Sequence, residues 1–146
     1  MSSKSFPDPD AITIEENNDT LKVMSWNLWW KFEDYLERQK LIFSEIEKLT
    51  PDIMCFQEVW EEEDESQADK IASLLGYEFV YGKSFDFDGV AFGNAIISKY
   101  PIQDHSVNYM AAEQKYDEKR LLLHAQILYK EMNLDIMCTH LNYKYE

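Results

Sequence analysis

The sequence predicts an α/β fold in which helices and strands alternate and several strands end at a shared edge. Two short apolar runs, Leu21–Asn27 and Pro51–Val59, each end near a polar residue, and one helix-length segment separates them. A strand, a crossover helix and a second strand normally form a parallel pair with both carboxyl ends at one sheet edge. A third run, Leu134–His140, ends on a histidine. Because ligands of α/β sheets bind at such edges, the three runs predict a site there.

The composition is typical of a globular chain of single-domain size. The 146 residues are 45% hydrophobic, and 28 Asp and Glu against 14 Lys and Arg give a net charge of −14. This charge repels polyanions, so broad electrostatic binding to duplex DNA is disfavoured. No segment has membrane-spanning length, and Met1–Asp10 lacks the apolar core of a signal peptide. Cys55 and Cys138 lie inside apolar runs, which indicates buried, reduced thiols and a cytoplasmic location.

We expect residues 1–20 to be a flexible leader, with Ala11–Ile14 a candidate edge strand, and residues 21–146 to form the domain. The segment Phe32–Leu49 predicts a helix, which Thr50-Pro51 ends because proline disfavours a helical residue before it. One stripe of this helix is apolar. It consists of Leu36, Ile42, Phe43, Ile46 and Leu49.

After this helix we predict a strand at Ile53–Gln57. The acidic run Glu61–Glu65 that follows is typical of a solvated loop. A second helix is expected at Ser66–Leu75, with Ile71, Leu74 and Leu75 inward and Gly76 as its stop. The remaining segments alternate between strands and turns. We predict strands at Glu78–Tyr81, Val90–Ser98 and Ile102–Tyr109, an exposed loop at Ser84–Asp88, and a hairpin of Arg120–Tyr129 and Asn133–His140 around Lys130-Glu131.

Elimination narrows the chemistry to an oxygen-rich site. The sequence contains no Gly-x-Ser-x-Gly elbow, and its four glycines form no phosphate-cradling loop. No pair of Cys or His residues has the spacing of zinc ligands. Magnesium takes one or two protein carboxylates, keeps several waters and is completed by substrate phosphate. Glu58, at the end of an apolar strand, is the natural candidate for such a carboxylate.

Four stretches of the sequence resemble, in the same order, motifs of the endonuclease/exonuclease/phosphatase superfamily, which has the fold of DNase I. They are Ser25–Trp29, Pro51–Val59, Gly93–Ile102 and Thr139–Leu141. The resemblance implies an Mg²⁺- or Mn²⁺-dependent phosphoesterase on a DNase I-like four-layer α/β sandwich, with a mixed sheet covered by two helices. The acidity favours a small phosphoester, a lipid headgroup or a nucleotide as substrate over duplex DNA.

The resemblance also implies roles for individual residues. Glu58 matches the carboxylate that holds the metal, and Asn27 matches the amide that orients the metal's outer shell and the acid. His140 matches the histidine that contacts the scissile phosphate. Arg120 resembles a supporting, substrate-binding arginine, and Asn94, inside the third motif, is a further substrate-binding candidate.

Each assignment has a plainer alternative. An asparagine often shapes the turn after a strand, and a lone histidine is more often a packed residue than a catalyst. Four tryptophans flank the site residues, and they either form a substrate rim or pack in the core and loops. They are Trp26, Trp29, Trp30 and Trp60.

The superfamily's later Gly-Asp-x-Asn and Ser-Asp-His motifs are absent, and the sequence ends at Glu146, six residues after His140. The sequence therefore resembles the N-terminal half of such an enzyme, which we expect to be inactive alone. The alternative function is a non-catalytic half-domain that docks a partner chain. The uncovered sheet surface would then bind a complementing C-terminal half or a second copy in a homodimer.

Overall fold

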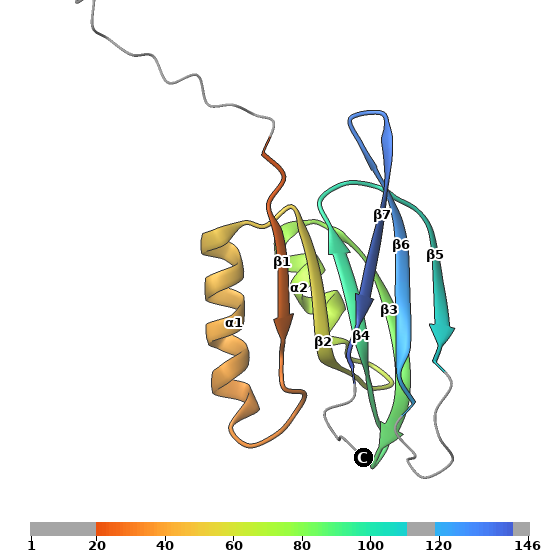
Figure 1. The fold of residues 1–146 in the computed structure, drawn as a ribbon. Coiled ribbons are helices and arrows are strands. Elements are labelled where there is room, and N and C mark those ends of the chain that lie inside the picture. Colours follow the sequence, from red (N-terminus) through yellow and green to blue (C-terminus); the bar gives the residue numbers. More distant parts are fainter. Residues whose placement is uncertain (1–19, 111–118, 142–146) are drawn as a thin grey trace, which may run out of the picture.

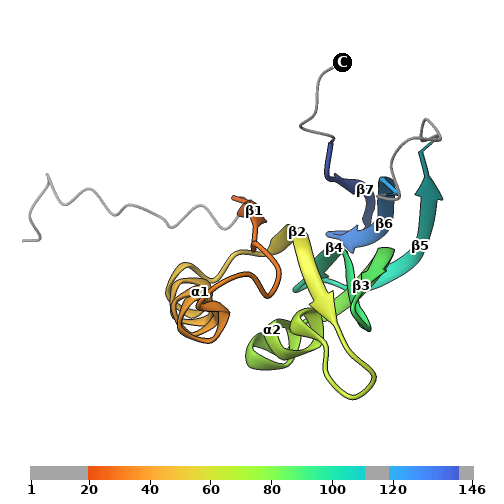
Figure 2. The same cartoon turned by 90° about the horizontal axis from the view of Figure 1, so that it is seen from below.

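The computed structural model describes residues 20–110 and 119–141, and it contains two β-sheets packed face to face, with two helices on the outer face of one sheet (Figures 1 and 2). The first sheet has the strand order β1-β2-β4-β3 and the second the order β5-β6-β7. The elements are β1 (Val23–Asn27), α1 (Tyr35–Leu49), β2 (Ile53–Glu61), α2 (Gln67–Leu75), β3 (Glu78–Phe87), β4 (Val90–Ser98), β5 (Ile102–Tyr109), β6 (Leu121–Tyr129) and β7 (Met132–Thr139). The candidate strand at Ala11–Ile14 lies outside the described residues.

The predicted strand–helix–strand unit is confirmed, because β1 and β2 are parallel neighbours in register from Val23–Ile53 to Asn27–Gln57. β4 runs antiparallel to both β2 and β3, so the first sheet is mixed. The predicted hairpin at the end of the pattern is also confirmed. Its turn residues Lys130 and Glu131 have φ values of 46° and 64°, as required by a two-residue type I′ turn, whose twist matches that of the strands.

The predicted loop at Ser84–Asp88 is wrong, because β3 continues through it to Phe87. Asp88 and Gly89, with φ values of 52° and 81°, form a tight turn that joins β3 directly to β4. Asp-Gly favours this turn, and it brings Phe87 into register with Val90. β2 is likewise longer than predicted, since Val59–Glu61 continue to pair with β4.

Fewer residues of the two helices face the sheet than their apolar stripes predict. Ile42 and Ile46 of α1 are buried, but Leu36 and Leu49, expected inward, are exposed. The helix lies beside the outer strand β1 (Figure 1), so part of its predicted apolar stripe does not face the sheet. In α2, Leu74 is also exposed, and the small side chains Ala68 and Ala72 face inward with Ile71.

Two apolar layers result, one on each face of the first sheet. The helix-side layer consists of the strand side chains that point toward the helices and of the helix residues that face them. Its members include Ile42, Ile46, Met54, Phe56, Val59, Ala68, Ile71, Ala95 and Ile97. The layer between the sheets consists of the side chains that point from the two sheets toward each other. Its members are Ile53, Cys55, Ile96, Leu121, Leu123, Ala125, Ile127 and Cys138. Both cysteines are buried free thiols, as predicted.

A near-continuously apolar run such as Leu21–Trp26 is typical of a strand covered on both faces, but β1 is not covered in this way, because Val23 and Trp26 are exposed. In the described sheet β1 is an outer strand that pairs with β2 alone.

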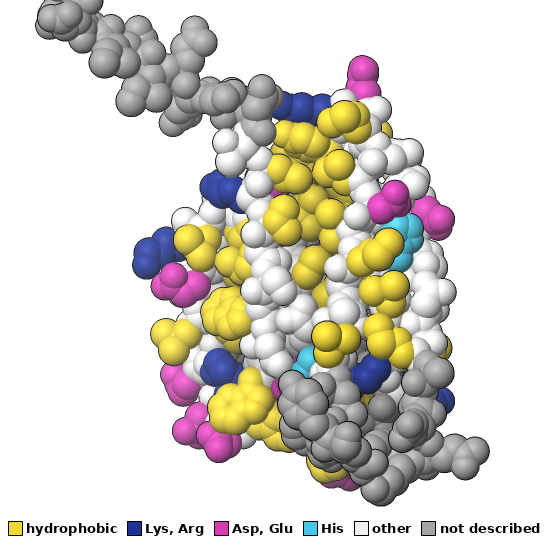
Figure 3. Space-filling view, viewed as in Figure 1, with side chains coloured by type: hydrophobic (Ala, Val, Ile, Leu, Met, Phe, Trp, Pro, Cys, Tyr) yellow, Lys and Arg dark blue, Asp and Glu magenta, His cyan; other side chains and the backbone are white. Residues whose placement is uncertain are grey.

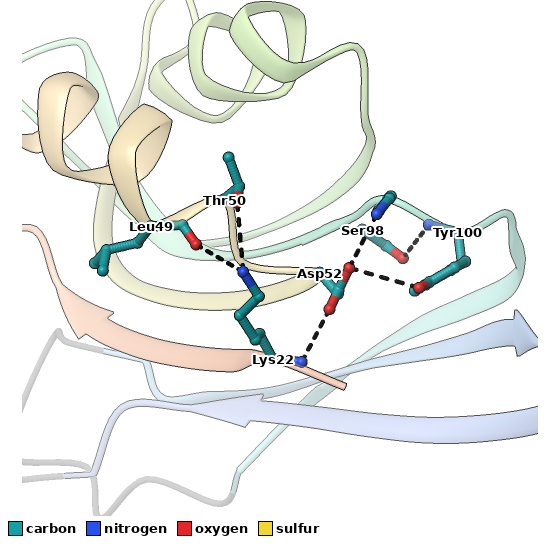
Figure 4. Close-up of polar contacts among 7 residues, drawn as sticks. Lys22, Leu49, Thr50, Asp52, Ser98 and Tyr100 are labelled. Atoms are coloured by element: carbon teal, nitrogen blue, oxygen red, sulfur yellow. Dashed lines mark hydrogen bonds and ion pairs between the residues drawn. The ribbon is translucent and has the colours of Figure 1, made fainter. Parts of the chain in front are cut away.

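A buried carboxylate ties the strands together at the end of the sheet where β1 and β2 begin (Figure 4). Asp52, just before β2, accepts a hydrogen bond of 2.9 Å from the backbone N–H of Lys22. The same carboxylate accepts from Lys99 Nζ at 3.3 Å and from the Tyr100 hydroxyl at 3.5 Å, both in the β4–β5 connection. The Lys99 amine keeps a raised pKa because it donates to Asp52. Asp52 thus fixes the starts of β1 and β2 and the end of β4 relative to one another.

Asp52→Asn is expected to lower the free energy of unfolding by about 1–3 kcal/mol, because the amide turns an NH2 group toward donors and loses the charge. Urea denaturation followed by circular dichroism measures the change. Asp104→Asn, at an exposed carboxylate on β5, is the matched control and is expected to stay close to the parent stability. Equal midpoints for the two variants would contradict the structural role of Asp52.

Candidate active site

Glu58 owes its orientation to a β-bulge in the middle of β2. The pairing of β2 with β4 shifts between Phe56 and Val59, so Gln57 and Glu58 together lie opposite Asn94. Glu58 has a left-handed φ of 54°, a conformation that costs a non-glycine residue about 1–2 kcal/mol. Val59 returns to the helix-side layer, so the extra residue shifts the alternation of the strand. Glu58 consequently faces the side on which the second sheet lies.

Asn27, the last residue of β1, is held directly against Glu58. Its Nδ2 donates a hydrogen bond of 2.9 Å to Glu58 Oε1, and its Oδ1 accepts one of 2.9 Å from the backbone N–H of Trp29. Two backbone bonds continue the contact beyond the strand, from the N–H of Leu28 to the carbonyl of Gln57 and from the N–H of Trp30 to that of Glu58. Asn27 therefore shapes a turn and orients the carboxylate at the same time.

His140 reaches the same carboxylate from the second sheet, immediately after β7. Its Nε2 lies 3.6 Å from Glu58 Oε1, and its Nδ1 lies 3.2 Å from Nη1 of Arg120. A guanidinium can only donate, so Nδ1 accepts and the imidazole proton resides on Nε2, facing Glu58. The ring stacks on Phe92, with centroids 6.3 Å apart and planes at 22°. The structure thus brings Asn27, Glu58, Arg120 and His140 into one cluster.

The cluster is accessible without being freely exposed, since the side chains of Glu58 and His140 are 15% and 22% exposed. Both contacts described above use Oε1 of Glu58, and no hydrogen bond from the described residues reaches Oε2. Residues 20–110 and 119–141 contain no group of three or more Asp, Glu, His or Cys side chains that could hold a metal ion. A single carboxylate with a free oxygen still fits Mg²⁺, which keeps several waters.

Two thiols lie behind the cluster, between the sheets. The thiols of Cys55 and Cys138 belong to the same buried cluster, and their interaction raises the pKa of Cys55 and lowers that of Cys138. Gln57 Nε2 lies 3.4 Å from Cys138 Sγ and also donates to it. These contacts link β2 and β7 close to the positions of Glu58 and His140.

Asn94 is the predicted site residue that the structure does not bring to the cluster surface. It lies on β4 opposite the bulge, is buried, and does not line the pocket next to Glu58. Its amide oxygen and nitrogen have no hydrogen-bond partner in the described part of the chain.

Sequence reasoning missed most of the pocket beside the cluster. This pocket, of about 270 Å³, is lined by Glu58, Arg120 and His140 and by six aromatic residues. Of the four tryptophans, Trp29 and Trp30 line it, whereas Trp26 and Trp60 do not. Three phenylalanines of the β3–β4 hairpin also line it, and the sequence signal for this hairpin is Asp-Gly between alternating aromatic residues. They are Phe85, Phe87 and Phe92.

Arg38 also supports the site, although no sequence motif marks it. From α1 it donates to the carbonyl oxygens of Leu28, Trp29, Trp30 and Phe32 at 3.0–3.3 Å, and so it holds the loop that follows Asn27. An arginine inside an amphipathic helix carries no distinguishing signal in the sequence.

Two packed sheets with helices outside one of them define a DNase I-like α/β fold. Its polar site combines a carboxylate at the β2 bulge with an amide at the end of β1 and a histidine just after β7. The model of the Endonuclease/Exonuclease/phosphatase family matches residues 24–129, and the chain belongs to this family. The family is of the phosphoesterase type, which confirms the resemblance seen in the motifs.

One curated protein and several solved structures are similar to this chain. The chain is 31% identical over 96 residues to an inositol phosphosphingolipids phospholipase C of Schizosaccharomyces pombe, a match that covers 64% of this chain and 22% of that protein. A family protein from Leptotrichia buccalis superposes with a TM-score of 0.72 at 18% identity, covering 84% of this chain and 55% of that one. Danio rerio TDP2, complexed with a single-strand DNA product, gives 0.67 at 21% identity, covering 85% and 47%.

The chain thus spans about half or less of the length of these relatives, and the described part corresponds to a portion of their fold. No helix among the described residues is long and apolar enough to cross a membrane.

Asn27→Asp is expected to destabilise the protein in a pH-dependent way. Two carboxylates at hydrogen-bond distance resist double ionisation, so the pKa of the pair rises above its value in the unfolded chain. The penalty is therefore present at about pH 8 and fades as the pH falls toward about 5.5 through the raised folded-state pKa. Urea denaturation at both pH values, in the presence of a chelator, measures it.

The matched control is Asn27→Leu, which removes the same hydrogen bonds without adding a charge. Its destabilisation is expected to be equal at both pH values. If the aspartate variant loses the same stability at the two pH values, its carboxylate does not lie against Glu58.

Proposed function

We propose that this chain carries part of the active site of an Mg²⁺-dependent phosphoesterase, either a phosphodiesterase or a phosphatase. The proposal depends on one observation: Asn27, at the end of β1, and His140, just after β7, both lie against the carboxylate oxygen Oε1 of Glu58 on β2. Family membership supports the reaction class. Mn²⁺ is the alternative cation, since the donor set is the same.

Glu58 would hold the cation through its carboxylate, and Asn27 would remain in the outer shell and fix the carboxylate's orientation. When bound, the cation neutralises charge that develops on the phosphoryl oxygens. His140, with its proton on Nε2, donates toward the same oxygens, and Arg120 holds the ring in this tautomer. Arg120 is then a positioning residue with a supporting part in phosphate binding.

The substrate is proposed to be a small phosphoester, a nucleotide or a lipid headgroup. The net charge of −14 opposes the approach of a long polyanion such as duplex DNA. A cytoplasmic location belongs to the same proposal, because the paired thiols of Cys55 and Cys138 are free and a reducing compartment keeps them so.

Glu58→Gln in the full-length protein is expected to lower Mg²⁺-dependent hydrolysis by about 100-fold or more, because the amide keeps the shape but loses the charge that holds the cation. Initial rates with bis(p-nitrophenyl) phosphate measure the loss, and a chelator should reproduce it in the unchanged protein. Glu45→Gln, at an exposed position on α1, is the control with the same chemistry. Unaltered turnover of the Glu58 variant would refute the proposal.

A second role follows from one side of the sandwich, the side between strands β1 and β7. There a band of hydrophobic side chains is open to solvent (Figure 3), and its residues include Leu21, Val23, Leu134 and Ile136. Both flanking strands are outer strands of the described sheets. Uncovered apolar surface with free strand edges binds a partner or aggregates. The proposed occupant is the complementing C-terminal half of the fold, and a second copy replaces it when the 146-residue chain is alone.

The isolated 146-residue chain is therefore expected to hydrolyse nothing measurable and to self-associate. Light scattering gives its mass. Val23→Lys, on the open side and 58% exposed, should return it toward the monomer, because a charge cannot be buried without a partner. Leu41→Lys, on α1 and 68% exposed, is the matched control and should not. A stable monomer of the unchanged chain would contradict the uncovered surface.

A further inference from the structure

The pocket beside Glu58 is unusual in that every apolar side chain lining it is aromatic. Its polar end consists of Glu58, Arg120 and His140. The rest of its lining contains no aliphatic side chain. The six aromatic residues, named here the aromatic wall, are Trp29, Trp30, Phe32, Phe85, Phe87 and Phe92. They come from two separate segments, the loop after β1 and the β3–β4 hairpin.

Contacts with α1 and β4 hold the loop half of the aromatic wall in place. The Arg38 guanidinium lies 4.8 Å from the centre of the Trp29 ring and donates to the carbonyl oxygens of this loop. Trp30 Nε1 donates a 3.0 Å hydrogen bond to the Ala91 carbonyl, which joins the loop to β4. The rings are thus held in place before any ligand binds, which lowers the entropy lost on binding.

The hairpin half leads directly to the polar end. Phe85 and Phe92 stack with centroids 4.8 Å apart and planes at 18°, and Phe92 in turn stacks on the His140 ring. Phe87 meets Trp30 edge-on at 5.7 Å and connects the two halves. A continuous aromatic surface therefore extends from the outer rim to the histidine.

Packing accounts for the buried members of the wall but not for its rim. Trp30 and Phe92 are buried, whereas Trp29, Phe32 and Phe87 are 45%, 41% and 59% exposed. Trp29 and Trp30 also have left-handed φ values of 61° and 41°, which strains the backbone. Exposed aromatic surface on a strained loop beside a polar cluster is typical of a ligand site.

We propose that the aromatic wall binds a planar aromatic ring that belongs to the same substrate molecule as the phosphoryl group. This inference rests on the phosphoester chemistry proposed above, which places the phosphoryl group at the polar end. Flat rings stack on flat rings in offset or edge-on geometry and gain more than burial alone provides, whereas an alkyl chain gains only from burial. The ring carries no negative charge of its own, since Glu58 and the acidic chain repel anions. A nucleobase and the phenyl group of an aryl ester share this chemistry.

The test compares phosphonates that differ only in the flatness of their ring. Calorimetric titration of the full-length protein with Mg²⁺ gives Kd values for phenyl-, cyclohexyl- and methylphosphonate. Phenylphosphonate is expected to bind about tenfold more tightly than cyclohexylphosphonate. Trp29→Leu and Phe87→Leu keep apolar side chains and should abolish this preference while leaving methylphosphonate unaffected. Trp26→Leu, at an exposed tryptophan outside the pocket, is the matched control and should keep it.

Equal affinity for phenyl- and cyclohexylphosphonate, or a preference that survives both leucine substitutions, would overturn the inference. Absence of binding by every flat ring, including uncharged benzyl alcohol, would overturn it too. If benzyl alcohol binds in a Trp29-dependent way but methylphosphonate does not bind at all, the aromatic wall stands and the proposed phosphate site fails. The two proposals are thus separable.

A second pair of ligands identifies the source of the ring. Adenosine 5′-monophosphate binding about tenfold more tightly than ribose 5-phosphate, with sensitivity to Phe87→Leu, assigns the wall to a nucleobase. Equal binding of these two, with the phenylphosphonate preference intact, assigns it to an aryl ester.

Discussion

The left-handed backbone of Glu58 is the constraint on which the site depends. Along β2, Ile53 and Cys55 face the second sheet, and Met54 and Phe56 face the helices. An unbroken alternation would turn Glu58 toward the helices, where a carboxylate in the apolar layer lacks a partner. The bulge inserts one residue, so Val59 takes the helix-side position instead. The conformational strain is offset by the hydrogen bonds from Asn27 and from the Trp30 N–H.

The bulge is effective because the strands around it are fixed at both ends. At the start of β1 and β2, Asp52 accepts from the Lys22 N–H, and at the end of β1 Asn27 donates to Glu58 in the bulge of β2. Both contacts join the same two strands, so neither strand can slide without losing a bond at each end. On the other side of the bulge, a Cβ on Gly93 would lie 2.2 Å from the Gly82 carbonyl oxygen. Only glycine permits β3 and β4 to approach this closely opposite the bulge.

The sequence predicted what depends on periodicity and on short motifs. The parallel pair β1–β2, the β6–β7 hairpin and the buried thiols are as expected, because alternation and burial are local signals. It did not predict the bulge, since no residue type marks a non-glycine left-handed conformation. It also missed the aromatic wall, which forms only when the β3–β4 hairpin meets the loop after β1. The exposure of Leu36 and Leu49 likewise depends on where α1 lies on the sheet.

The open side of the sandwich and the candidate site are parts of one surface. Asn27 ends β1 and His140 follows β7, and these two outer strands flank the uncovered apolar band. Any segment that covers the band by pairing with either strand must therefore end beside Glu58. Its side chains would enter the cluster at positions where the described residues offer one carboxylate, one imidazole and one guanidinium. Under the proposed function, covering the core and completing the polar cluster would then be a single event, and loss of the covering segment would lower stability and activity together.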